Sequence, residues 1–317
     1  MEILSGDRKD NSPRGRIATV GMFDGVHLGH RHLLRSLIDE GAKRGLTPMA
    51  ATFTAHPLKV ISSSRPTPPA ITTLPERLLL LESTGIAECL LLDFDRRLMS
   101  LSARDFLRML RDGYDVRAFI TGFNNRFGSD TSLTFHDYQI IATEEGIELI
   151  QASEFSPGRH DSVISSSAIR SLISTHGNVE EAAMMLGRPY SLSGTVVHGN
   201  ALGRTIGFPT ANLNPDSPDK VIPLKGVYAC QAILPGNTAD VLPAMVNIGE
   251  RPTFNDSRGL SIEAHIIGLH SDIYDQPLTL HFLKRLRDER RFSSPQALKE
   301  QLIIDSDQTI AFNKKNL

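Results

Sequence analysis

The sequence of 317 residues has only two cysteines, Cys89 and Cys230, and each lies in a short apolar stretch typical of a strand. Two such cysteines do not make a disulfide framework, so the composition favours a reducing compartment. The formal net charge is only −2. The chain therefore lacks both the basic excess of nucleic-acid-binding surfaces and the acidic block of a disordered tail.

Long hydrophobic runs are also missing. No stretch approaches the ~18 consecutive apolar residues of a membrane-spanning helix, and residues 1–16 lack the apolar core of a signal peptide. We therefore predict a cytoplasmic protein that binds neither membranes nor nucleic acid. Nothing in the sequence indicates the oligomeric state. The length suits two domains, since one domain usually holds ~100–200 residues.

In the first half, short apolar segments alternate with amphipathic segments of helical period. This order is typical of a parallel sheet that is wound by crossover helices and covered on both faces. We predict an α/β, Rossmann-like domain over residues 1–187. Helices are expected from Arg31 to Arg44, after Pro75 and after Ser102. Strands are expected at residues 17–20, 47–53, 88–94, 117–122 and 147–153.

The pattern changes near residue 187. Strand-like segments then follow one another without intervening helices, separated by Gly, Pro, Asn and Asp. A last helix has Ser294 as its N-cap and Pro295 in its first position. We therefore predict an antiparallel barrel or sandwich with a closing helix over residues 188–317. Residues 62–75, which are rich in Pro and Ser, are expected to form a surface loop.

Two histidines lie where the first strand gives way to the first helix, in the segment GMFDGVHLGH at residues 21–30. Ligands of a doubly wound sheet bind beyond the carboxyl ends of its strands, and a helix start favours phosphate. Gly25 and Gly29 would let an anion approach the bare backbone. His27 and His30, one helical turn apart, could donate to charge that develops on a phosphorus centre.

Other interpretations of these histidines remain open at this point. They could be surface residues, or one could cap the helix. A zinc site that also uses His32 and His56 is a further possibility, although no HExxH segment and no cysteine pair supports it.

A serine-rich segment, ISSSAIR at residues 164–170, resembles a second phosphate cradle. Hydroxyl groups at a helix start and an arginine one turn later, Arg170, can bind a phosphate together. The alternative is simple capping by Ser166 or Ser167, with Arg170 in solvent.

In the second half, GNALGRT at residues 199–205 is close to a Walker A loop but is not one. Its glycines are one residue too close together, and Arg204 stands where lysine belongs. A Walker A loop must open a helix, and the following segment contains Pro209 and a polar turn. Any phosphate bound here is therefore bound within a β architecture.

The segment FPTAN and a later glutamate suggest phosphoryl chemistry. Thr210 and Asn212 face the same way in an extended chain, and their neutral oxygens suit a Mg²⁺ ion that takes its negative ligands from nucleotide phosphates. Capping of a turn is the alternative. Glu263 shares a strand face with His265 and could accept the proton of a hydroxyl group. It could equally be an ordinary exposed acid.

Taken together, these segments resemble the prokaryotic bifunctional riboflavin kinase/FMN adenylyltransferases, or FAD synthetases. GMFDGVHLGH, TAHP, ITTLPERLLLLESTGIAECLLLDFD, ITGFNNRFG and ISSSAIR resemble the adenylyltransferase half. GTVVHGNALGRTIGFPTANL, GVYAC, NIGERPTF, EAHI and RLRDERRFSS resemble the kinase half, in the family's order. The resemblance implies phosphorylation of riboflavin to FMN by ATP, followed by transfer of AMP from a second ATP to FMN.

The resemblance also implies which residues serve each step. The implied catalytic residues are Glu263 as general base of the kinase, and His27, His30 and Arg170 of the adenylyltransferase. The implied nucleotide-binding residues are Gly21, Phe23, Gly25, Gly29, Ser165, Ser166, Ser167, Gly199, Gly203, Arg204, Thr210 and Asn212, of which Thr210 and Asn212 also bind Mg²⁺. The implied flavin-binding residues are His56, Asn124, Arg126, Phe127, Arg285 and Arg287.

Four segments depart from the family pattern. AHP replaces the usual Pro-His-Pro but keeps His56. Asn124 replaces the usual aspartate, SDT follows Gly128 in place of basic residues, and residues 268–270 replace Asp-Phe. Two alternatives therefore stay open: a riboflavin kinase with a degenerate adenylyltransferase half, and a non-catalytic flavin or nucleotide sensor. The full set of implied catalytic residues argues against a sensor, because a binding protein needs no base.

Overall fold

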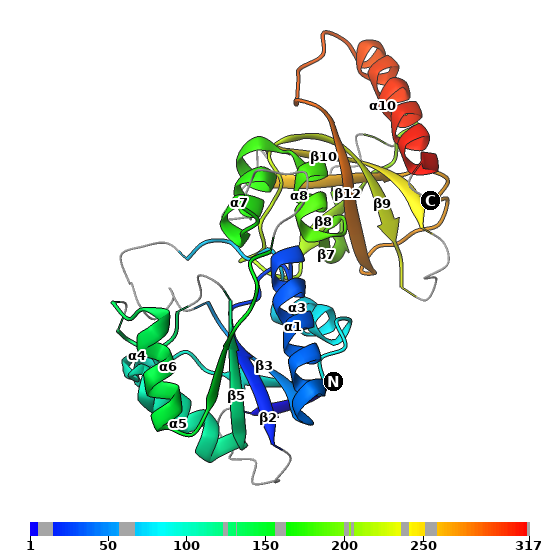
Figure 1. Ribbon diagram of the computed structural model, residues 1–317. Coiled ribbons are helices and arrows are strands. Elements are labelled where there is room, and N and C mark those ends of the chain that lie inside the picture. Colours follow the sequence, from blue (N-terminus) through cyan, green and yellow to red (C-terminus); the bar gives the residue numbers. More distant parts are fainter. Residues whose placement is uncertain are drawn as a thin grey trace. The chain divides into compact units, whose positions relative to one another are not determined.

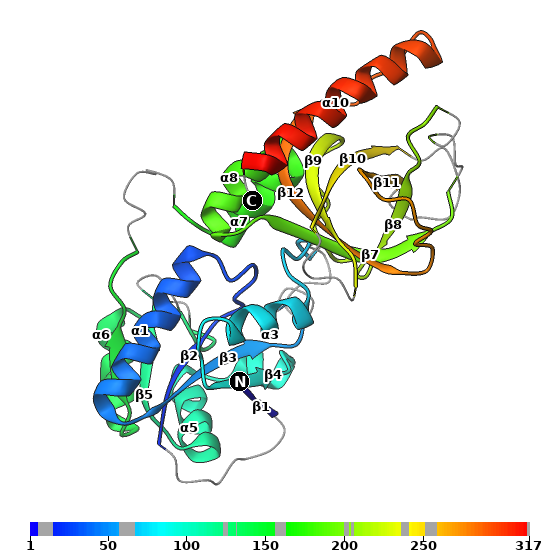
Figure 2. The same ribbon diagram turned by 90° about the vertical axis from the view of Figure 1, so that its right-hand side faces the viewer.

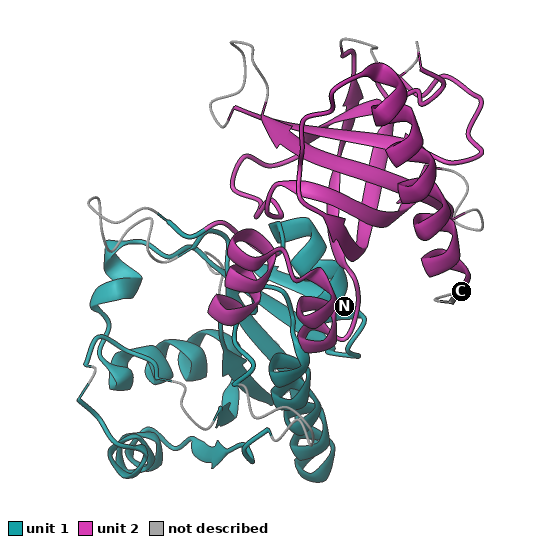
Figure 3. Cartoon of the chain, turned by 90° about the horizontal axis from the view of Figure 1, so that it is seen from above, with its two compact units in different colours: residues 1–68, 72–165 teal, residues 69–71, 166–317 magenta. Residues whose placement is uncertain are grey.

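The computed structural model describes the chain except for residues 6–14, 57–66, 123–125, 131, 156–162, 200–202, 204–205, 236–240, 251–258 and 316–317. The chain forms two compact units (Figure 3). The first unit comprises residues 1–68 and 72–165, and the second comprises residues 69–71 and 166–317.

A parallel sheet forms the centre of the first unit (Figure 1). Its six strands have the order β1-β4-β3-β2-β5-β6. The strands are β1 (Glu2–Ser5), β2 (Arg16–Val20), β3 (Thr47–Phe53), β4 (Glu88–Leu92), β5 (Val116–Thr121) and β6 (Glu148–Gln151). The helices are α1 (Leu28–Arg44), α3 (Leu74–Glu82), α4 (Arg96–Ser100), α5 (Ala103–Tyr114) and α6 (Phe135–Glu144). The predicted Rossmann-like architecture is confirmed.

Helices cover both faces of this sheet. Leu34 and Leu37 of α1 share one core cluster with Ile17 of β2, whereas Phe106 of α5 shares a second cluster with Val20 of the same strand. Successive residues of a strand point to opposite faces. Burial on both faces therefore explains why the strands are continuous apolar runs.

The chain order creates a topological switch between β2 and β5. From β2 the chain winds outward through β3 to β4, and it then returns to β5 on the other side of β2. Ligands bind beyond the carboxyl ends of the strands at such a switch. The segments that follow Val20 and Thr121 begin at this position. The first carries His27 and His30, and the second carries three of the six predicted flavin-binding residues, Asn124, Arg126 and Phe127.

A closed six-stranded barrel forms the core of the second unit (Figure 2). Its strands have the order β10-β11-β8-β7-β12-β9 and are all antiparallel to their neighbours. They are β7 (Tyr190–Val197), β8 (Ala211–Pro215), β9 (Gly226–Ile233), β10 (Leu242–Glu250), β11 (Leu260–Ile266) and β12 (Pro277–Arg287). Of the two predicted β architectures, the barrel is therefore the correct one.

Helical segments precede and follow the barrel. Before it lie α7 (Ser166–Ser171), a π-helical turn (Leu172–His176) and α8 (Val179–Leu186). The last helix, α10 (Pro295–Lys315), begins as predicted. Its N-cap Ser294 accepts the backbone N–H of Ala297 through its hydroxyl oxygen at 3.2 Å.

The compact units divide between Ser165 and Ser166, because the helical segment packs on β7 and β12 of the barrel. The functional modules are predicted to divide at residue 187 instead. A helix can pack on one unit and serve the activity of the other, so the division at residue 187 stays a prediction about function.

Three local expectations need correction. Helix α1 begins at Leu28 rather than Arg31, because His27 is its N-cap. Strand β1 was not predicted. The predicted surface loop at 62–75 is wrong at Ile71 and Thr72, which are buried at 1% and 5% exposure, whereas the other described residues of the segment are exposed or half-buried. Residues 62–66 lie outside the described residues.

Within the described ranges, no helix is both long and apolar enough to cross a lipid bilayer. Cys89 and Cys230 are free and buried. Burial raises the pKa of Cys89 to about 11 and that of Cys230 well above its ordinary value. Both thiols are therefore protonated near neutral pH and chemically inert.

Candidate functional site

The segment that links β2 to α1 has a strained backbone. Phe23, Gly25 and Val26 have φ angles of 49°, 82° and 39°. This left-handed region is open to glycine, but it is costly for a bulky or β-branched side chain. Such strain persists only where the surrounding structure imposes it, and it concentrates at ligand-binding sites.

Hydrogen bonds with Thr72 and Asp24 stabilise the backbone of this segment. The Oγ1 atom of Thr72 accepts the backbone N–H of Gly25 at 2.9 Å and donates to Oδ1 of Asp24 at 3.1 Å. The same carboxylate oxygen accepts the backbone N–H of Thr72 at 2.9 Å. The N–H of Gly25 is therefore engaged within the protein. This N–H is therefore not offered to an anion, and the positive φ of Gly25 favours glycine here. Close approach of an anion to the backbone at Gly25 stays a prediction.

Arg77 of α3 is the second support. The residue as a whole is 1% exposed. It donates to the carbonyl of Met22 at 3.1 Å and to the carbonyl of Phe53. Arg77 thus ties the segment after β2 to the carboxyl end of β3.

His27 and His30 are brought together by the start of α1. The Nδ1 atom of His27 accepts the backbone N–H of His30 at 3.3 Å, so the proton of a neutral His27 ring is on Nε2. The two rings are stacked with their centroids 3.6 Å apart. Gly29 leaves room for this stack, since a Cβ there would lie 3.3 Å from the His27 ring. The two predicted residues are therefore adjacent, with His27 also acting as the cap.

Several buried nitrogen atoms around this segment lack a hydrogen-bond partner. In the part of the chain that the structure describes, these include Nδ1 of His30, Nε of Arg31 and Nε of Arg77. Buried polar atoms are rarely left unsatisfied unless a ligand or water completes them. An anion at the start of α1 is the ligand that such a helix end and such side chains favour.

Burial and the neighbouring His27 hold the pKa of His30 well below its ordinary value. The unfolded chain binds a proton at this histidine near pH ~6.5, whereas the folded chain does not. The first unit should therefore lose stability as the pH falls from about 7 toward the folded pKa. In a His30→Asn variant this loss should be smaller.

This prediction is checked by hydrogen exchange of the α1 amides, measured by mass spectrometry between pH 7.5 and 5.5 and corrected for intrinsic exchange rates. The corrected rates give the free energy of opening of α1 at each pH. His136→Asn, an exposed position in α6, is the matched control and should keep the wild-type pH dependence. An unchanged dependence in His30→Asn would contradict the expected role of His30.

A cavity of about 240 Å³ lies beside the same strand ends. Predicted residues Gly21, Arg126 and Phe127 line it, together with Phe53 and Phe94. The rings of Phe53 and Phe94 meet edge to face at 5.3 Å. Phe127 is 6% exposed and belongs largely to the core. An aromatic slot with one cationic side chain suits a planar, anionic ligand.

The serine-rich segment is divided between the two units. Ser165 ends the first unit, and Ser166, Ser167 and Arg170 belong to the second. The carbonyl oxygen of Ile164 lies 4.0 Å from the position of a Cβ on Gly29. The serine-rich segment thus starts beside the first turn of α1.

In the barrel, Glu263 lies between two asparagines on neighbouring strands. It is paired in register with Asn212 of β8 and with Asn247 of β10. Residues directly opposite one another in antiparallel strands share a face and lie in contact distance. The predicted base and one predicted metal ligand are therefore neighbours.

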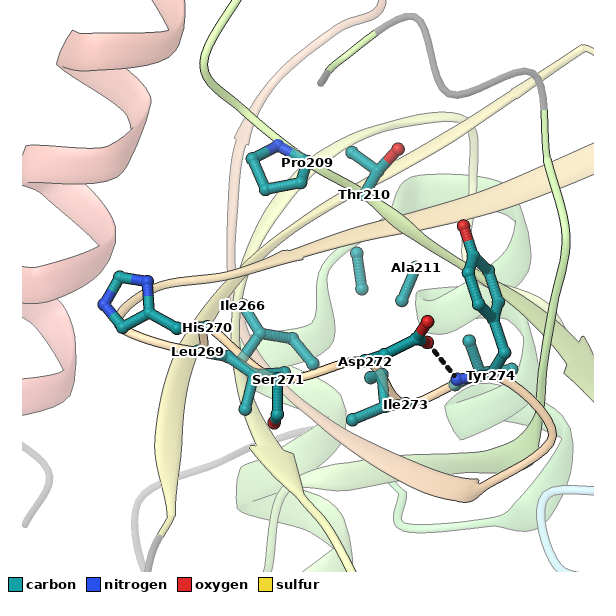
Figure 4. Close-up of a pocket in the computed structure, with 12 residues that line it drawn as sticks. Pro209, Thr210, Ala211, Ile266, Leu269, His270, Ser271, Asp272, Ile273 and Tyr274 are labelled. Carbon is teal, nitrogen blue, oxygen red and sulfur yellow. Dashed lines mark hydrogen bonds between the residues drawn. The ribbon is translucent and has the colours of Figure 1, made fainter.

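Two cavities share Thr210 as a wall. The larger, of about 660 Å³, is lined by Glu263 and Asn247 and, on its apolar side, by Phe292 and Leu298. The smaller, of about 360 Å³, lies between the turn Pro209–Ala211 and the segment Leu269–Tyr274 (Figure 4). Thr210 lies between the two, which is the arrangement needed for a group to pass from one ligand to another.

The smaller cavity has an aromatic wall. Tyr274 stacks on His198 with centroids 3.8 Å apart, and its backbone N–H donates to Asp272 at 3.0 Å. A flat, partly polar slot of this kind suits a nucleobase.

The glycines of the near-Walker segment are required by packing. A Cβ on Gly199 would lie 2.0 Å from the amide nitrogen of Asn212, and one on Gly203 would lie 2.1 Å from the carbonyl oxygen of Phe208. Both glycines therefore shape the surroundings of Asn212 and Thr210. Two predicted site residues, Arg204 and Asn124, lie outside the described residues. His56 is described, but residues 57–66, which follow it, are not.

Arg285 and Arg287 lie on different sides of β12. Arg287 lines the larger cavity and forms an ion pair with Asp305 of α10 at 2.7 Å. Arg285 lines neither barrel cavity and instead binds the carbonyl of Lys225 and the carboxylate of Asp288. A register shift between the two arginines separates them, although residues two apart normally share a face.

Sequence reasoning missed Asp24, Thr72, Arg77 and Asn247. Asp24 and Asn247 lie inside segments that carry the family resemblance, but their partners are distant in sequence. Thr72 and Arg77 lie in ITTLPERL, which marks the start of a helix and belongs to a segment that carries the family resemblance, but neither signal assigns these two residues a role. A buried polar network cannot be read from spacing alone.

Two family models match the chain: one described as FAD synthetase over residues 9–168, and one described as riboflavin kinase over residues 186–313. A bifunctional riboflavin kinase/FMN adenylyltransferase of Escherichia coli (strain K12) is 37% identical over 292 residues, which cover 92% of this chain and 90% of the relative. A protein of the same description from Bacillus subtilis (strain 168) is 32% identical and covers 93% of this chain and 92% of the relative.

Among solved structures, a crystal structure from Streptococcus pneumoniae, described as a macrolide-efflux protein, matches with a TM-score of 0.85 at 31% identity. The match covers 98% of this chain and 99% of that one. The resemblance inferred from the sequence is confirmed: the chain belongs to the family of bifunctional riboflavin kinases/FMN adenylyltransferases.

Proposed function

We propose that this chain makes FAD from riboflavin in two steps that each consume ATP, one step in each half. The observation that carries the proposal is the arrangement of the barrel: Thr210 separates two cavities, and Glu263 lines the larger one. Riboflavin occupies the larger, mostly apolar cavity, and ATP occupies the smaller one. Membership in the family supports the pairing of this kinase with an adenylyltransferase.

In the kinase step, Glu263 accepts the proton of the ribityl 5′-hydroxyl group. The oxygen forms a bond to the γ-phosphorus of ATP while the bond from that phosphorus to the β–γ bridging oxygen breaks, and ADP leaves. A carboxylate at hydrogen-bonding distance from the hydroxyl is what such a transfer requires. The products are FMN and ADP.

Thr210 and Asn212 are the residues that would hold a Mg²⁺ ion. Their hydroxyl and amide oxygens are hard, neutral donors, and such donors fit an ion that is also bound by phosphate oxygens. The packing of Asn212 against Gly199 fixes where its amide lies. When bound, Mg²⁺ neutralises charge on the phosphates of ATP.

In the adenylyltransferase step, a phosphate oxygen of FMN forms a bond to the α-phosphorus of a second ATP, and pyrophosphate leaves. This nucleophile is already largely ionised near pH 7, since the second pKa of a phosphate ester is ~6. No base is needed. Catalysis rests on alignment and on the donors that disperse charge: His27, His30, Arg170 and the N–H groups at the start of α1.

The flavin ring of FMN occupies the aromatic cavity beside Gly21, and Arg126 binds its phosphate or a carbonyl oxygen of the ring. Ser165, Ser166 and Ser167 bind the phosphates of the second ATP. The functional adenylyltransferase module extends through this segment to residue 187. The buried, reduced cysteines are consistent with a cytoplasmic location.

The test is to incubate riboflavin with MgATP and the purified protein and to separate the flavins by chromatography. We expect FMN first and then FAD, with pyrophosphate released in the second phase. FMN without FAD, also when FMN is supplied directly, would identify a kinase with a degenerate adenylyltransferase half. Retention of unchanged riboflavin would identify a flavin-binding protein and overturn the proposal.

A further inference from the structure

The backbone ladder between β8 and β11 stops beside the catalytic residues. Its register pairs Glu263 with Asn212 and Ala264 with Ala211. The next position would set His265 opposite Thr210, but Pro209 precedes Thr210 and has no N–H to donate. Here a side-chain hydrogen bond replaces the backbone ladder: the Nδ1 atom of His265 lies 2.8 Å from the carbonyl oxygen of Pro209.

The chemistry of this contact fixes the tautomer of His265. A carbonyl oxygen only accepts, so Nδ1 of His265 carries the proton. The bond is kept whether the ring is neutral or protonated, because Nδ1 is a donor in both states. The ring also meets Phe208 edge on, with centroids 5.1 Å apart. His265 therefore contacts both Pro209 and the residue before it.

The hydrogen bond from His265 restrains ψ of Pro209, the one backbone torsion that the proline ring does not fix. The pyrrolidine ring locks φ of a proline near −65°, so ψ alone sets the direction of the Pro209 carbonyl. A donor aimed at that carbonyl fixes ψ, and with it the plane of the peptide that leads into Thr210. Thr210 is the wall between the two cavities.

We infer that His265 is a positioning residue for phosphoryl transfer: through the Pro209 carbonyl it places the Thr210 hydroxyl between the two ligands. The inference rests on the proposed kinase function. His265 also lines the larger cavity. Glu263 of the same strand keeps the role of base, and the Nδ1–H of His265 is engaged by the Pro209 carbonyl.

The test compares two amides that differ only in where they carry their N–H groups. The amide nitrogen of asparagine is bonded to Cγ, as Nδ1 of histidine is, whereas that of glutamine is bonded to Cδ. His265→Asn can therefore keep the bond to Pro209, and His265→Gln cannot. For riboflavin phosphorylation we expect kcat/KM for MgATP to fall about tenfold in His265→Gln, the effect of one lost hydrogen bond. His265→Asn should stay within about threefold of wild type.

Two readouts separate positioning from general damage. His265 lines the cavity assigned to riboflavin, and both variants remove its ring, so any change in the KM for riboflavin should be the same in the Asn and Gln variants. Adenylylation of supplied FMN should stay at the wild-type rate in both. His281→Gln, on β12 and outside both cavities, is the matched control and should leave the kinase unchanged. Equal activity of the Asn and Gln variants, or a more active Gln variant, overturns the inference. Wild-type protein that makes no FMN refutes the proposed function instead.

Discussion

Replacement of Glu263 by glutamine is expected to lower kcat for riboflavin phosphorylation by ~10²–10⁴, the usual contribution of a general base. Glutamine keeps the size and the hydrogen-bonding capacity of the side chain but cannot accept the hydroxyl proton. Its neighbours Asn212 and Asn247 offer no replacement base. The measurement is the rate of FMN formation from riboflavin and MgATP.

The same polypeptide supplies the internal control for this variant. Supplied FMN should still be adenylylated at the wild-type rate, since that step uses the first unit. Glu250→Gln changes an exposed glutamate of β10 and should leave both rates unchanged. If Glu263→Gln retained more than about a tenth of the wild-type kinase rate, Glu263 would not be the base.

Removal of either His27 or His30 should slow FAD formation from supplied FMN by ~10²–10³, the usual loss for one donor to a developing anion. The two single variants should lower the rate of FAD formation for different structural reasons. Asparagine at position 27 can still cap α1, so His27→Asn removes mainly the ring. His30→Asn removes the ring that stacks on His27. Pyrophosphate release with FMN and MgATP measures the step, and the double variant should lose less than the product of the two effects.

His32→Asn is the matched control for these variants. His32 lies in the same helix, where its Nε2 atom contacts Ser153, and its loss should change adenylylation by less than about threefold. Within the described residues, which include His27, His30, His32 and His56, no group of three or more His, Cys, Asp or Glu side chains could hold a metal ion, so the zinc alternative is wrong. A large loss in His32→Asn would therefore mean that the losses are not specific to the two stacked rings. Kinase activity should be unchanged in all of these variants, and full adenylylation by the variant that lacks both His27 and His30 would contradict their catalytic role.

Much of the fold could be predicted from periodicity and capping residues. Ser102 and Ser294 correctly mark the starts of α5 and α10, and alternating apolar segments give the order of strands and helices. The start of α1 was predicted three residues too late, although a capping histidine was one of the open interpretations, because spacing alone did not show that His27 is the cap. Ile71 and Thr72 were misjudged because a Pro-rich composition suggests a loop, whereas burial of such a segment depends on partners elsewhere in the chain.

For the site, motifs were sufficient where the chemistry requires a residue type at a fixed spacing. His27 with His30, and Asn212 with Glu263, are neighbours in the structure. The supports beneath these residues were not predictable, since Thr72 and Arg77 act through hydrogen bonds to distant backbone atoms. The irregular pairing of β12 with β9 could not be predicted from the sequence either. It separates Arg285 from the cavity that Arg287 lines.

The position of Thr210 as a shared wall also bears on inhibitor design. A single molecule that joins an isoalloxazine ring to adenosine through a phosphate chain could fill both barrel cavities at once. Linked fragments gain up to ~10²–10⁴ in avidity when the linker matches the distance between their sites. The length of that chain, more than either ring system, would decide how tightly such a bisubstrate compound binds.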